Sequence, residues 1–300
     1  MNAHTDIAVN PTLSIVVIFH NMRREAPRTL HTMSEAYQRG VDGTEWEVLA
    51  VDNGSTEPLD PEMVLAFGRQ FSYQRFETQS VSPVDAINDA ATHARGTHIG
   101  VCIDGARMLS PGVIQHTLAG LRAYPRGVIC TLSWHLGDKL QNLAVLDGYD
   151  QSREDELLST VDWRHDGYQL FDIACLAASS KPGYGAAIAE SNCIFLSRES
   201  FEDLGGFDTG FKTPGGGLAN LDFMRRAVLA PGASNIHLLG EGSFHQFHGG
   251  VATNVAPNLH PAKQFDEEYR ELRGEPFRKP DAPAVYIGAL AENTRRFIAP

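Results

Sequence analysis

The chain has 300 residues, 42% of them hydrophobic and 21% charged, so it can bury a sizeable core in one large domain or two small ones. Its formal net charge of −12 argues against a nucleic-acid-binding surface. No apolar run is long enough for a transmembrane segment, and the polar start does not resemble a signal peptide. With four widely spaced cysteines and no Cys-x-x-Cys pair, we expect a cytoplasmic protein.

The first 110 residues alternate predicted strands and helices. Strands are predicted at 13–19, 47–52, 71–78 and 98–104, and helices at 24–38, 58–67 and 84–95. The strands at 47–52 and 98–104 are continuous apolar runs, which is typical of buried parallel strands. The alternation predicts an α/β fold with a parallel, doubly wound sheet.

The second part of the chain is less regular. A helix at 111–123 and a strand at 127–132 are followed by residues 135–185, where only a charged helix at 151–161 is evident. We interpret 135–185 as an insertion or a set of long loops near the site. Further predictions are a strand at 188–197, helices at 198–204, 221–229 and 260–273, a glycine-rich stretch at 214–217 and a tail to residue 300.

Two of the predicted strands end in an aspartate, Asp52 and Asp104. Ligands of open α/β sheets bind just outside the carboxyl ends of the strands. One carboxylate could accept a hydrogen bond from a nucleoside, and the other could bind a ribose or a metal. A single aspartate at such a position more often begins a turn or caps a helix, so the hypothesis depends on the pair.

The order of these elements resembles the glycosyltransferases of the GT-A fold, family 2 in particular, over roughly residues 12–250. The resemblance is carried by the opening strand, by Val51-Asp52-Asn53-Gly54-Ser55-Thr56, by the helix with Asn88, by the Asp104 strand and by Leu204-Gly205-Gly206-Phe207-Asp208. It implies a Rossmann-like, mixed and mostly parallel sheet with helices on both faces. The implied domain covers 12–254, with a nucleotide-binding half at 12–110 and a metal and acceptor half at 111–254 that contains the 135–185 insertion. Residues 255–300 would form a C-terminal helical tail.

Some details are similar to the polypeptide N-acetylgalactosaminyltransferases, which share this fold: Phe19-His20-Asn21 after the first strand, and Asn220-Leu221-Asp222 before a helix. The resemblance implies that Asp52 accepts a hydrogen bond from the base and that His20 and Asn21 line the same pocket. The nucleotide-sugar-binding residues that it implies are Phe19, His20, Asn21, Asp52, Asn88, Asp104 and Asp208.

The metal motif departs from the family's Asp-x-Asp or Asp-x-His, because the sequence here is Asp104-Gly105-Ala106 and Ala106 cannot bind a metal. With Asp104 as the first ligand of Mn²⁺ or Mg²⁺, the resemblance offers His248 as a substitute ligand, and His245 after it. Alternatively, both histidines are ordinary loop or core residues, or the site is metal-independent and Arg107 or another cation holds the diphosphate.

The catalytic base is a second departure. Inverting members have Glu-Asp where this chain has Ala219-Asn220, and an asparagine cannot act as a base. Asp222 or Glu190 could replace it. In a retaining mechanism the leaving phosphate takes the proton, and Asn220 would steady the sugar.

The resemblance therefore predicts a glycosyltransferase that moves a sugar from a nucleotide-sugar donor to a hydroxyl acceptor. A UDP-sugar is favoured because Asp52 suits the N3–H donor of uracil, with GDP- and dTDP-sugars as alternatives. The acceptor could be a glycan, a lipid-linked glycan or a small molecule, and a homo-oligomer is left open. A second hypothesis is a degenerate GT-A domain that binds nucleotide sugar or glycan without turnover, because Ala106, Ala219 and Asn220 replace functional residues.

Overall fold

The structure is a computed structural model that describes residues 10–298. The strands are β1 Leu13–Phe19, β2 Trp46–Asn53, β3 Phe71–Phe76, β4 His98–Cys102, β5 Arg107–Leu109, β6 Gly127–Leu136, β7 Ala174–Leu176, β8 Cys193–Ser197, β9 Ser234–His245 and β10 Ala284–Gly288. The helices are α1 Ala26–Thr32, α2 Pro61–Leu65, α3 Val84–His93, α4 Val113–Ala123, α5 Gln141–Ala144, α6 Gln151–Leu158, α7 Arg198–Asp203, α8 Ala219–Val228 and α9 Ala262–Arg273.

One mixed sheet joins all of these strands in the order β10-β9-β6-β8-β4-β1-β2-β3, with β5 on β9 and β7 on β6. Neighbours β1, β2, β3 and β4 pair in parallel, as do β6, β9 and β10. Strand β8 runs antiparallel to β4 and β6 between these two groups. The predicted α/β fold with a mostly parallel sheet is therefore confirmed.

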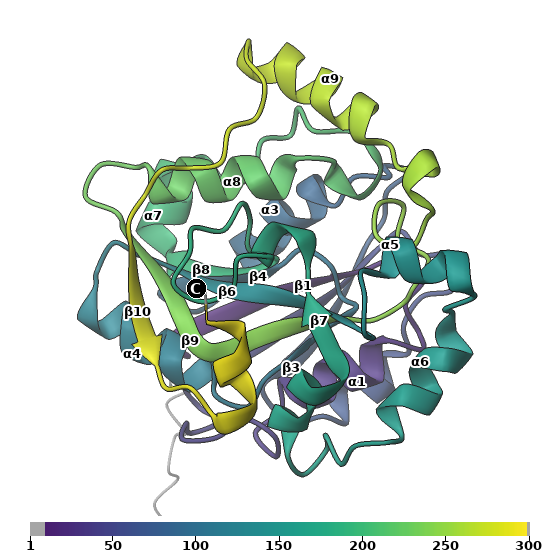
Figure 1. Cartoon of the computed structure of the whole chain (residues 1–300). Helices are drawn as coiled ribbons and strands as arrows, with labels where there is room; N and C mark the ends of the chain where they lie inside the picture. Colours follow the sequence, from purple (N-terminus) through teal and green to yellow (C-terminus); the bar gives the residue numbers. More distant parts are fainter. Residues whose placement is uncertain (1–9, 299–300) are drawn as a thin grey trace, which may run out of the picture.

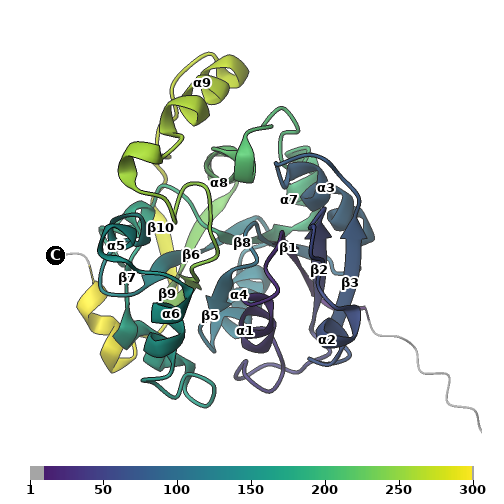
Figure 2. The same ribbon diagram turned by 90° about the vertical axis from the view of Figure 1, so that its right-hand side faces the viewer.

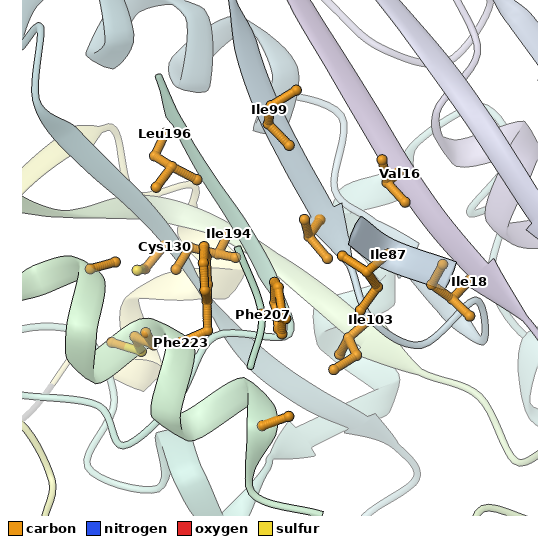
Figure 3. Close-up of a cluster of buried hydrophobic side chains, with 14 of the residues drawn as sticks. Val16, Ile18, Ile87, Ile99, Ile103, Cys130, Ile194, Leu196, Phe207 and Phe223 are labelled. Atoms are coloured by element: carbon orange, nitrogen blue, oxygen red, sulfur yellow. The ribbon is translucent and has the colours of Figure 1, made fainter. Parts of the chain in front are cut away.

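Helices cover both faces of the sheet, with α3, α7 and α8 on one side and α1 and α4 on the other (Figures 1 and 2). Successive side chains of a strand point to opposite faces, so Val16 and Ile18 of β1 join one hydrophobic cluster while Val17 and Phe19 join the other. Figure 3 shows the first cluster, where Phe223 of α8 approaches the sheet. Both faces of β1 are buried, which explains its uninterrupted apolar sequence.

The predicted helix at 24–38 is shorter in the structure, because α1 ends at Thr32 and turns continue to Gln38. The hydroxyls of Thr32 and Ser34 donate to the backbone carbonyls of Thr29 and His31. Such side-chain bonds compete with regular helical hydrogen bonding.

The sequence-based prediction missed strand β9, which is the longest strand in the described part of the chain. Its sequence includes Asn235, His237, Gly240 and Glu241, and therefore lacks both an apolar run and regular alternation. Gly240 has a φ of +79°, and the pairing with β6 shifts register at Cys130 to Leu132. Tertiary pairing at the centre of the sheet outweighs the weak local propensity of this strand.

The expectation of a helical tail at 255–300 is wrong in part. Helix α9 forms close to the predicted 260–273 and lies at the periphery in both views (Figures 1 and 2). Strand β10 then pairs in parallel with β9, so the tail extends the main sheet. The short, half-exposed β10 carries little sequence signal of its own.

The carboxyl ends of β1, β2, β4 and β6 open on one edge of the sheet. Strand β9 ends at the same edge, since it pairs in parallel with β6 as far as His135 and His245. The turns that follow these strands therefore converge, as expected for a ligand site in an open α/β sheet.

Candidate metal centre and functional site

Asp104, His245 and His248 form a compact cluster at this edge of the sheet. Asp104 follows β4, and the antiparallel pairing of β5 with β9 places Arg107 opposite His245. The Nε2 atom of His245 lies 3.0 Å from Oδ2 of Asp104 and 3.2 Å from Nε2 of His248. The Nε2 atom of His248 lies 3.6 Å from the same carboxylate oxygen. The structure thus brings together the three residues that were expected to bind metal.

Gln141 of α5 determines the tautomer of His245. Its Nε2 donates to the backbone carbonyl of His245 (3.0 Å), so its Oε1 accepts from Nδ1 of His245 (2.6 Å) and from Asn254 (2.9 Å). With Nδ1 protonated, Nε2 of neutral His245 carries a lone pair. That lone pair and the Asp104 carboxylate face each other as two acceptors, an arrangement that a cation between them would satisfy.

The charges agree with this interpretation. Burial lowers the pKa of His245 to about 4, so its ring is neutral at pH 7. Burial alone would raise the pKa of Asp104, but the charge of the neighbouring His248 holds it well below its usual range. One carboxylate oxygen and two imidazole nitrogens are a donor set that suits Mn²⁺ better than Mg²⁺, which prefers oxygen ligands.

Ala106 is fully buried, and its carbonyl accepts a hydrogen bond from the backbone of Gln246 (2.8 Å). The neighbouring strand thus runs directly beside the position where the family's second ligand is missing, and it carries His245. Next in the chain, Arg107 is 4% exposed, and its Nε lies 3.7 Å from Oδ2 of Asp104. Two of its buried nitrogens, Nε and Nη1, have no hydrogen-bond partner, so a positive charge is available beside the cluster.

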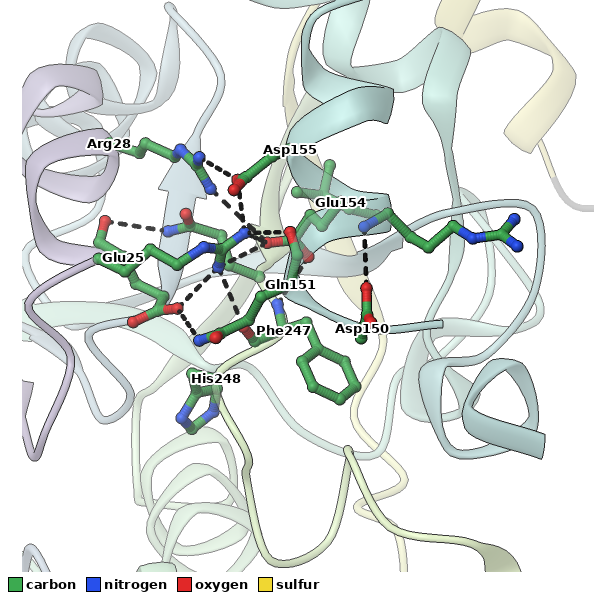
Figure 4. A network of polar contacts seen from close by, with 12 residues as sticks. Glu25, Arg28, Asp150, Gln151, Glu154, Asp155, Phe247 and His248 are labelled. Carbon is green, nitrogen blue, oxygen red and sulfur yellow. Dashed lines mark hydrogen bonds and ion pairs between the residues drawn. The ribbon is translucent and has the colours of Figure 1, made fainter. Parts of the chain in front are cut away.

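The turn that carries His248 is held by the 135–185 segment (Figure 4). Glu154 of α6 accepts from the backbone N–H of Phe247 (2.6 Å), and Arg24 donates to the Phe247 carbonyl (3.2 Å). Arg24 also bonds Asp155 (2.6 Å) and Glu25 (2.8 Å). This network connects α6 and the residues just before α1 to Phe247, which precedes His248 in the chain.

Asp52 is placed differently from the expectation of a base contact. Its side chain is fully buried, and its two oxygens accept from the backbone N–H groups of Ser55 and Leu59, each at 3.0 Å. The turn after β2 therefore folds around this carboxylate. The residue that presents a free acceptor is its neighbour Asn53, whose buried Oδ1 has no hydrogen-bond partner. Both residues lie at the carboxyl end of β2, where the sequence predicted a ligand contact, and Asn53 is one residue further along the chain.

The two residues after β1 contact this turn. His20 is exposed, and its Nδ1 lies 2.9 Å from the carbonyl of Asn53. Asn21 has a φ of +53°, and its Oδ1 accepts from Thr56 (3.0 Å) and Glu57 (3.2 Å). The strain of a non-glycine residue in the left-handed region is thus offset by these hydrogen bonds.

Two expected sugar-binding residues and Phe19 have structural roles. Phe19 is fully buried in the core. Asn88 bonds both the N–H (3.0 Å) and the carbonyl (2.8 Å) of Phe207, so it fixes that turn. Asp208 pairs with Arg273 of α9 (2.8 Å). Within residues 10–298, the polar contacts of Asn88 and Asp208 do not involve Asp104, His245 or His248.

Asn220 and Glu190 are brought together. The amide of Asn220 donates to Glu190 (3.1 Å) and to Asn192 (3.3 Å), and Asn192 in turn bonds Ser133 of β6 (3.3 Å). Glu190 is half-buried, so its carboxylate keeps some access to solvent.

Asp222 is excluded as a free base by its contacts. It is 2% exposed and receives hydrogen bonds from Arg226 (2.8 Å) and, through both oxygens, from Arg273 (2.6 and 2.7 Å). A carboxylate engaged in this way stabilises the packing of α9 on α8.

Comparisons with known proteins identify the family. The model of glycosyl transferase family 2 matches residues 14–205, which is more than half of the chain. The chain belongs to glycosyl transferase family 2. The matched region of this family 2 protein includes Asp52, Asp104 and Glu190, whereas His245 and His248 lie beyond it. A search of curated proteins finds no significant match.

Solved structures share the fold. S. aureus TarS is 14% identical over 78% of this chain and 36% of its own, with a TM-score of 0.54. TarS 1–349 in complex with UDP-GlcNAc is 17% identical over 87% of this chain and 65% of its own, with a TM-score of 0.56. The mannosyltransferase PcManGT from Pyrobaculum calidifontis, in complex with GDP-Man and Mn²⁺, is 17% identical over 90% and 66%, with a TM-score of 0.53.

The family 2 protein thus spans between about one third and two thirds of the length of these structures. The matches support the GT-A fold and family 2, and nothing in them supports the narrower resemblance to polypeptide N-acetylgalactosaminyltransferases. No helix in residues 10–298 combines the length and hydrophobicity that crossing a bilayer requires.

Proposed function

We propose that this family 2 protein is a Mn²⁺-dependent glycosyltransferase that moves a sugar from a nucleotide-sugar donor to a hydroxyl acceptor. The observation that carries the proposal is the Asp104, His245 and His248 cluster at the carboxyl edge of the sheet. Neighbouring folds support the donor class, because the TarS structure contains UDP-GlcNAc and the PcManGT structure contains GDP-Man with Mn²⁺.

Asp104, His245 and His248 would hold the metal, which when bound neutralises charge on a diphosphate leaving group. The buried guanidinium of Arg107 adds a second positive charge beside the same place. Arginine suits this role because it stays charged and donates in a planar fork. The protein is acidic overall, but Arg107 and the proposed metal make this edge of the sheet locally positive. An anionic donor can therefore bind there.

The base of the nucleotide would bind near Asn53, His20 and Asn21. The free Oδ1 acceptor of Asn53 matches the N3–H donor of uracil, which favours a UDP-sugar. In this proposal Asp52 shapes the turn and Asn53 contacts the base. A guanine base also has an N–H donor, so GDP is the alternative that the binding experiment must compare.

Glu190 is our candidate for the base that accepts the proton of the acceptor hydroxyl. Its hydrogen bond from Asn220 holds the carboxylate in place. In the alternative, retaining chemistry, Asn220 would contact the sugar and the leaving phosphate would take the proton. NMR of the product anomer distinguishes retention from inversion directly.

Binding measurements test the donor proposal. Calorimetric titration of UDP and GDP, each with and without Mn²⁺, should give tight binding for UDP only when Mn²⁺ is present. Equal UDP affinity with and without the metal would contradict the proposed metal centre.

Turnover tests the second hypothesis, a degenerate domain that binds without catalysis. Release of UDP from UDP-GlcNAc, or of GDP from GDP-mannose, should be measurable with Mn²⁺ and absent in Asp104→Asn. Donor binding without any release of nucleotide would favour the degenerate domain, for which the losses at Ala106 and Ala219 argue. The complete three-ligand cluster argues for turnover.

A further inference from the structure

Helix α9 contacts the segment 208–222, which leads from the Gly205–Phe207 turn into the first turn of α8. This segment begins beyond the residues that the family model matches. It includes Asn220, the residue that bonds Glu190. What holds the segment therefore affects the acceptor side of the proposed site.

Glu268 of α9 holds the middle of the segment. Its carboxylate accepts from the backbone N–H groups of Lys212 (2.7 Å) and Thr213 (2.8 Å) and from the hydroxyl of Thr213 (2.6 Å). Three hydrogen bonds to one ionised group are stronger than bonds between neutral partners. A single side chain thus fixes the backbone of the two residues that precede Pro214.

Arg273, at the end of α9, holds both ends of the segment. It bonds Asp222 through two nitrogens (2.6 and 2.7 Å) and Asp208 through a third (2.8 Å). Its guanidinium also lies over the ring of Phe211, 5.4 Å from the centroid. The buried rings of Tyr269 and Phe211 pack together between the two polar contacts, with centroids 6.1 Å apart.

The part of the segment between these contacts is a glycine loop. Gly215, Gly216 and Gly217 have φ values of +69°, +82° and +53°, and they have no side chains to pack. The N–H of Gly215 donates to the carbonyl of Val81 (3.0 Å), and a Cβ on Gly215 would meet only Val251, at 3.7 Å. The glycine loop therefore lies beside the turn that follows His248.

We propose that α9 positions the acceptor side of the site, with Glu268 and Arg273 as positioning residues for the glycine loop and for Asn220. The inference rests on the proposed function. It predicts that the contacts of α9 matter for transfer to an acceptor hydroxyl and have little effect on the metal or the nucleotide. The donor side is held separately, by Gln141, Glu154 and the Asp52 turn.

Three variants test the proposal. Glu268→Ala removes all three hydrogen bonds, and Glu268→Gln keeps an oxygen that can accept from the two N–H groups. Glu271→Ala is the matched control, because Glu271 lies on the same helix and is exposed. For each variant we would measure Mn²⁺-dependent UDP affinity, hydrolysis of UDP-GlcNAc and GDP-mannose, and transfer to a panel of p-nitrophenyl β-glycosides.

In Glu268→Ala we expect transfer to fall about tenfold relative to donor hydrolysis, with the main effect on the KM for the glycoside. UDP affinity should change less than about twofold, since no nucleotide contact is removed. Glu268→Gln should recover most of the transfer, and Glu271→Ala should behave as the unmodified chain. An equal loss of UDP binding, hydrolysis and transfer in Glu268→Ala would overturn the proposal.

Amide hydrogen exchange provides a readout that does not require turnover. Exchange in peptides covering 208–222 should accelerate in Glu268→Ala and not in Glu271→Ala, while peptides covering 98–109 and 241–250 stay unchanged. Unaltered exchange at 208–222 would refute the positioning role even if no glycoside is accepted. Failure of the unmodified chain to bind UDP would instead refute the proposed function, and the exchange result would still decide whether α9 holds the loop.

Discussion

The imidazole of His245 lies 3.0 Å from the carboxylate of Asp104, although the two residues come from strands far apart in the chain. Strand β5 makes this possible, because it continues from Asp104 and pairs with β9 so that Arg107 faces His245. The neighbouring strand β9 thus brings an imidazole to Asp104 even though Ala106 removes the ligand expected two residues after it. The proposed metal centre depends on this strand.

Removing either histidine should weaken Mn²⁺ binding. We expect His245→Ala and His248→Ala each to lower the affinity at least about tenfold, because a ligand contributes no less than its supporting residues. His165→Ala is the control, since His165 is exposed and paired with Asp162. Isothermal titration with Mn²⁺ measures the effect, and affinities equal to that of the control would remove the histidines from the site.

Gln141→Ala should weaken Mn²⁺ binding without removing a ligand. The substitution deletes the acceptor that keeps Nδ1 of His245 protonated and the ring oriented. Loss of such a supporting hydrogen bond costs about 10- to 100-fold in metal affinity. Circular dichroism should show an unchanged fold, and an unchanged affinity would indicate that the ring orientation does not depend on Gln141.

Substitutions at Asp52 and Asn53 should change different properties of the protein, its stability in the first case and its UDP affinity in the second. Asp52→Ala leaves two backbone N–H groups buried without acceptors, which should lower the free energy of unfolding by about 1–3 kcal/mol per group. Asn53→Ala removes the free Oδ1 and should mainly weaken UDP binding, whereas Asn53→Asp keeps an acceptor. Urea unfolding and calorimetry separate the two, and full UDP affinity in Asn53→Ala would contradict the proposed base contact.

Glu190→Gln should abolish transfer and leave UDP affinity unchanged, because Glu190 is proposed to act on the acceptor. The expected loss is about 10²- to 10⁴-fold in turnover, the usual contribution of a general base. Asp222→Asn should instead destabilise the fold, since it weakens the pair with Arg226 and Arg273. Normal turnover in Glu190→Gln would favour a retaining mechanism without an enzymic base.

The pH dependence of stability should reveal Glu154. Burial raises its pKa from an ordinary value of 4.5 to about 7, despite hydrogen bonds from Phe247 and Arg24 that act the other way. Between pH 4.5 and 7 the folded state holds a proton that the unfolded state has released, so this group's contribution to stability declines as pH rises. Glu154→Gln cannot titrate and should lack that decline. Urea unfolding at pH 5 and pH 8 measures it, and identical slopes in both proteins would refute the raised pKa.

Several features of the fold follow from local sequence. The apolar runs of β1, β2 and β4 predict buried parallel strands, since both faces of each strand pack against helices. The position of Asp104 at the end of such a run also places it at the ligand-binding edge of the sheet. In these strands nearly every consecutive residue is buried, so the sequence alone is sufficient to predict them.

Which of the candidate site residues are free to bind a ligand depends on tertiary structure. Strand β9 has no clear pattern of its own and forms because β6, β5 and β10 pair with it. Its position alone makes His245 a neighbour of Asp104. Likewise, Asp52 and Asp222 are carboxylates in suggestive motifs, but backbone N–H groups occupy the first and two arginines occupy the second. Sequence determines which side chains are available, whereas long-range packing decides which of them stay free to bind.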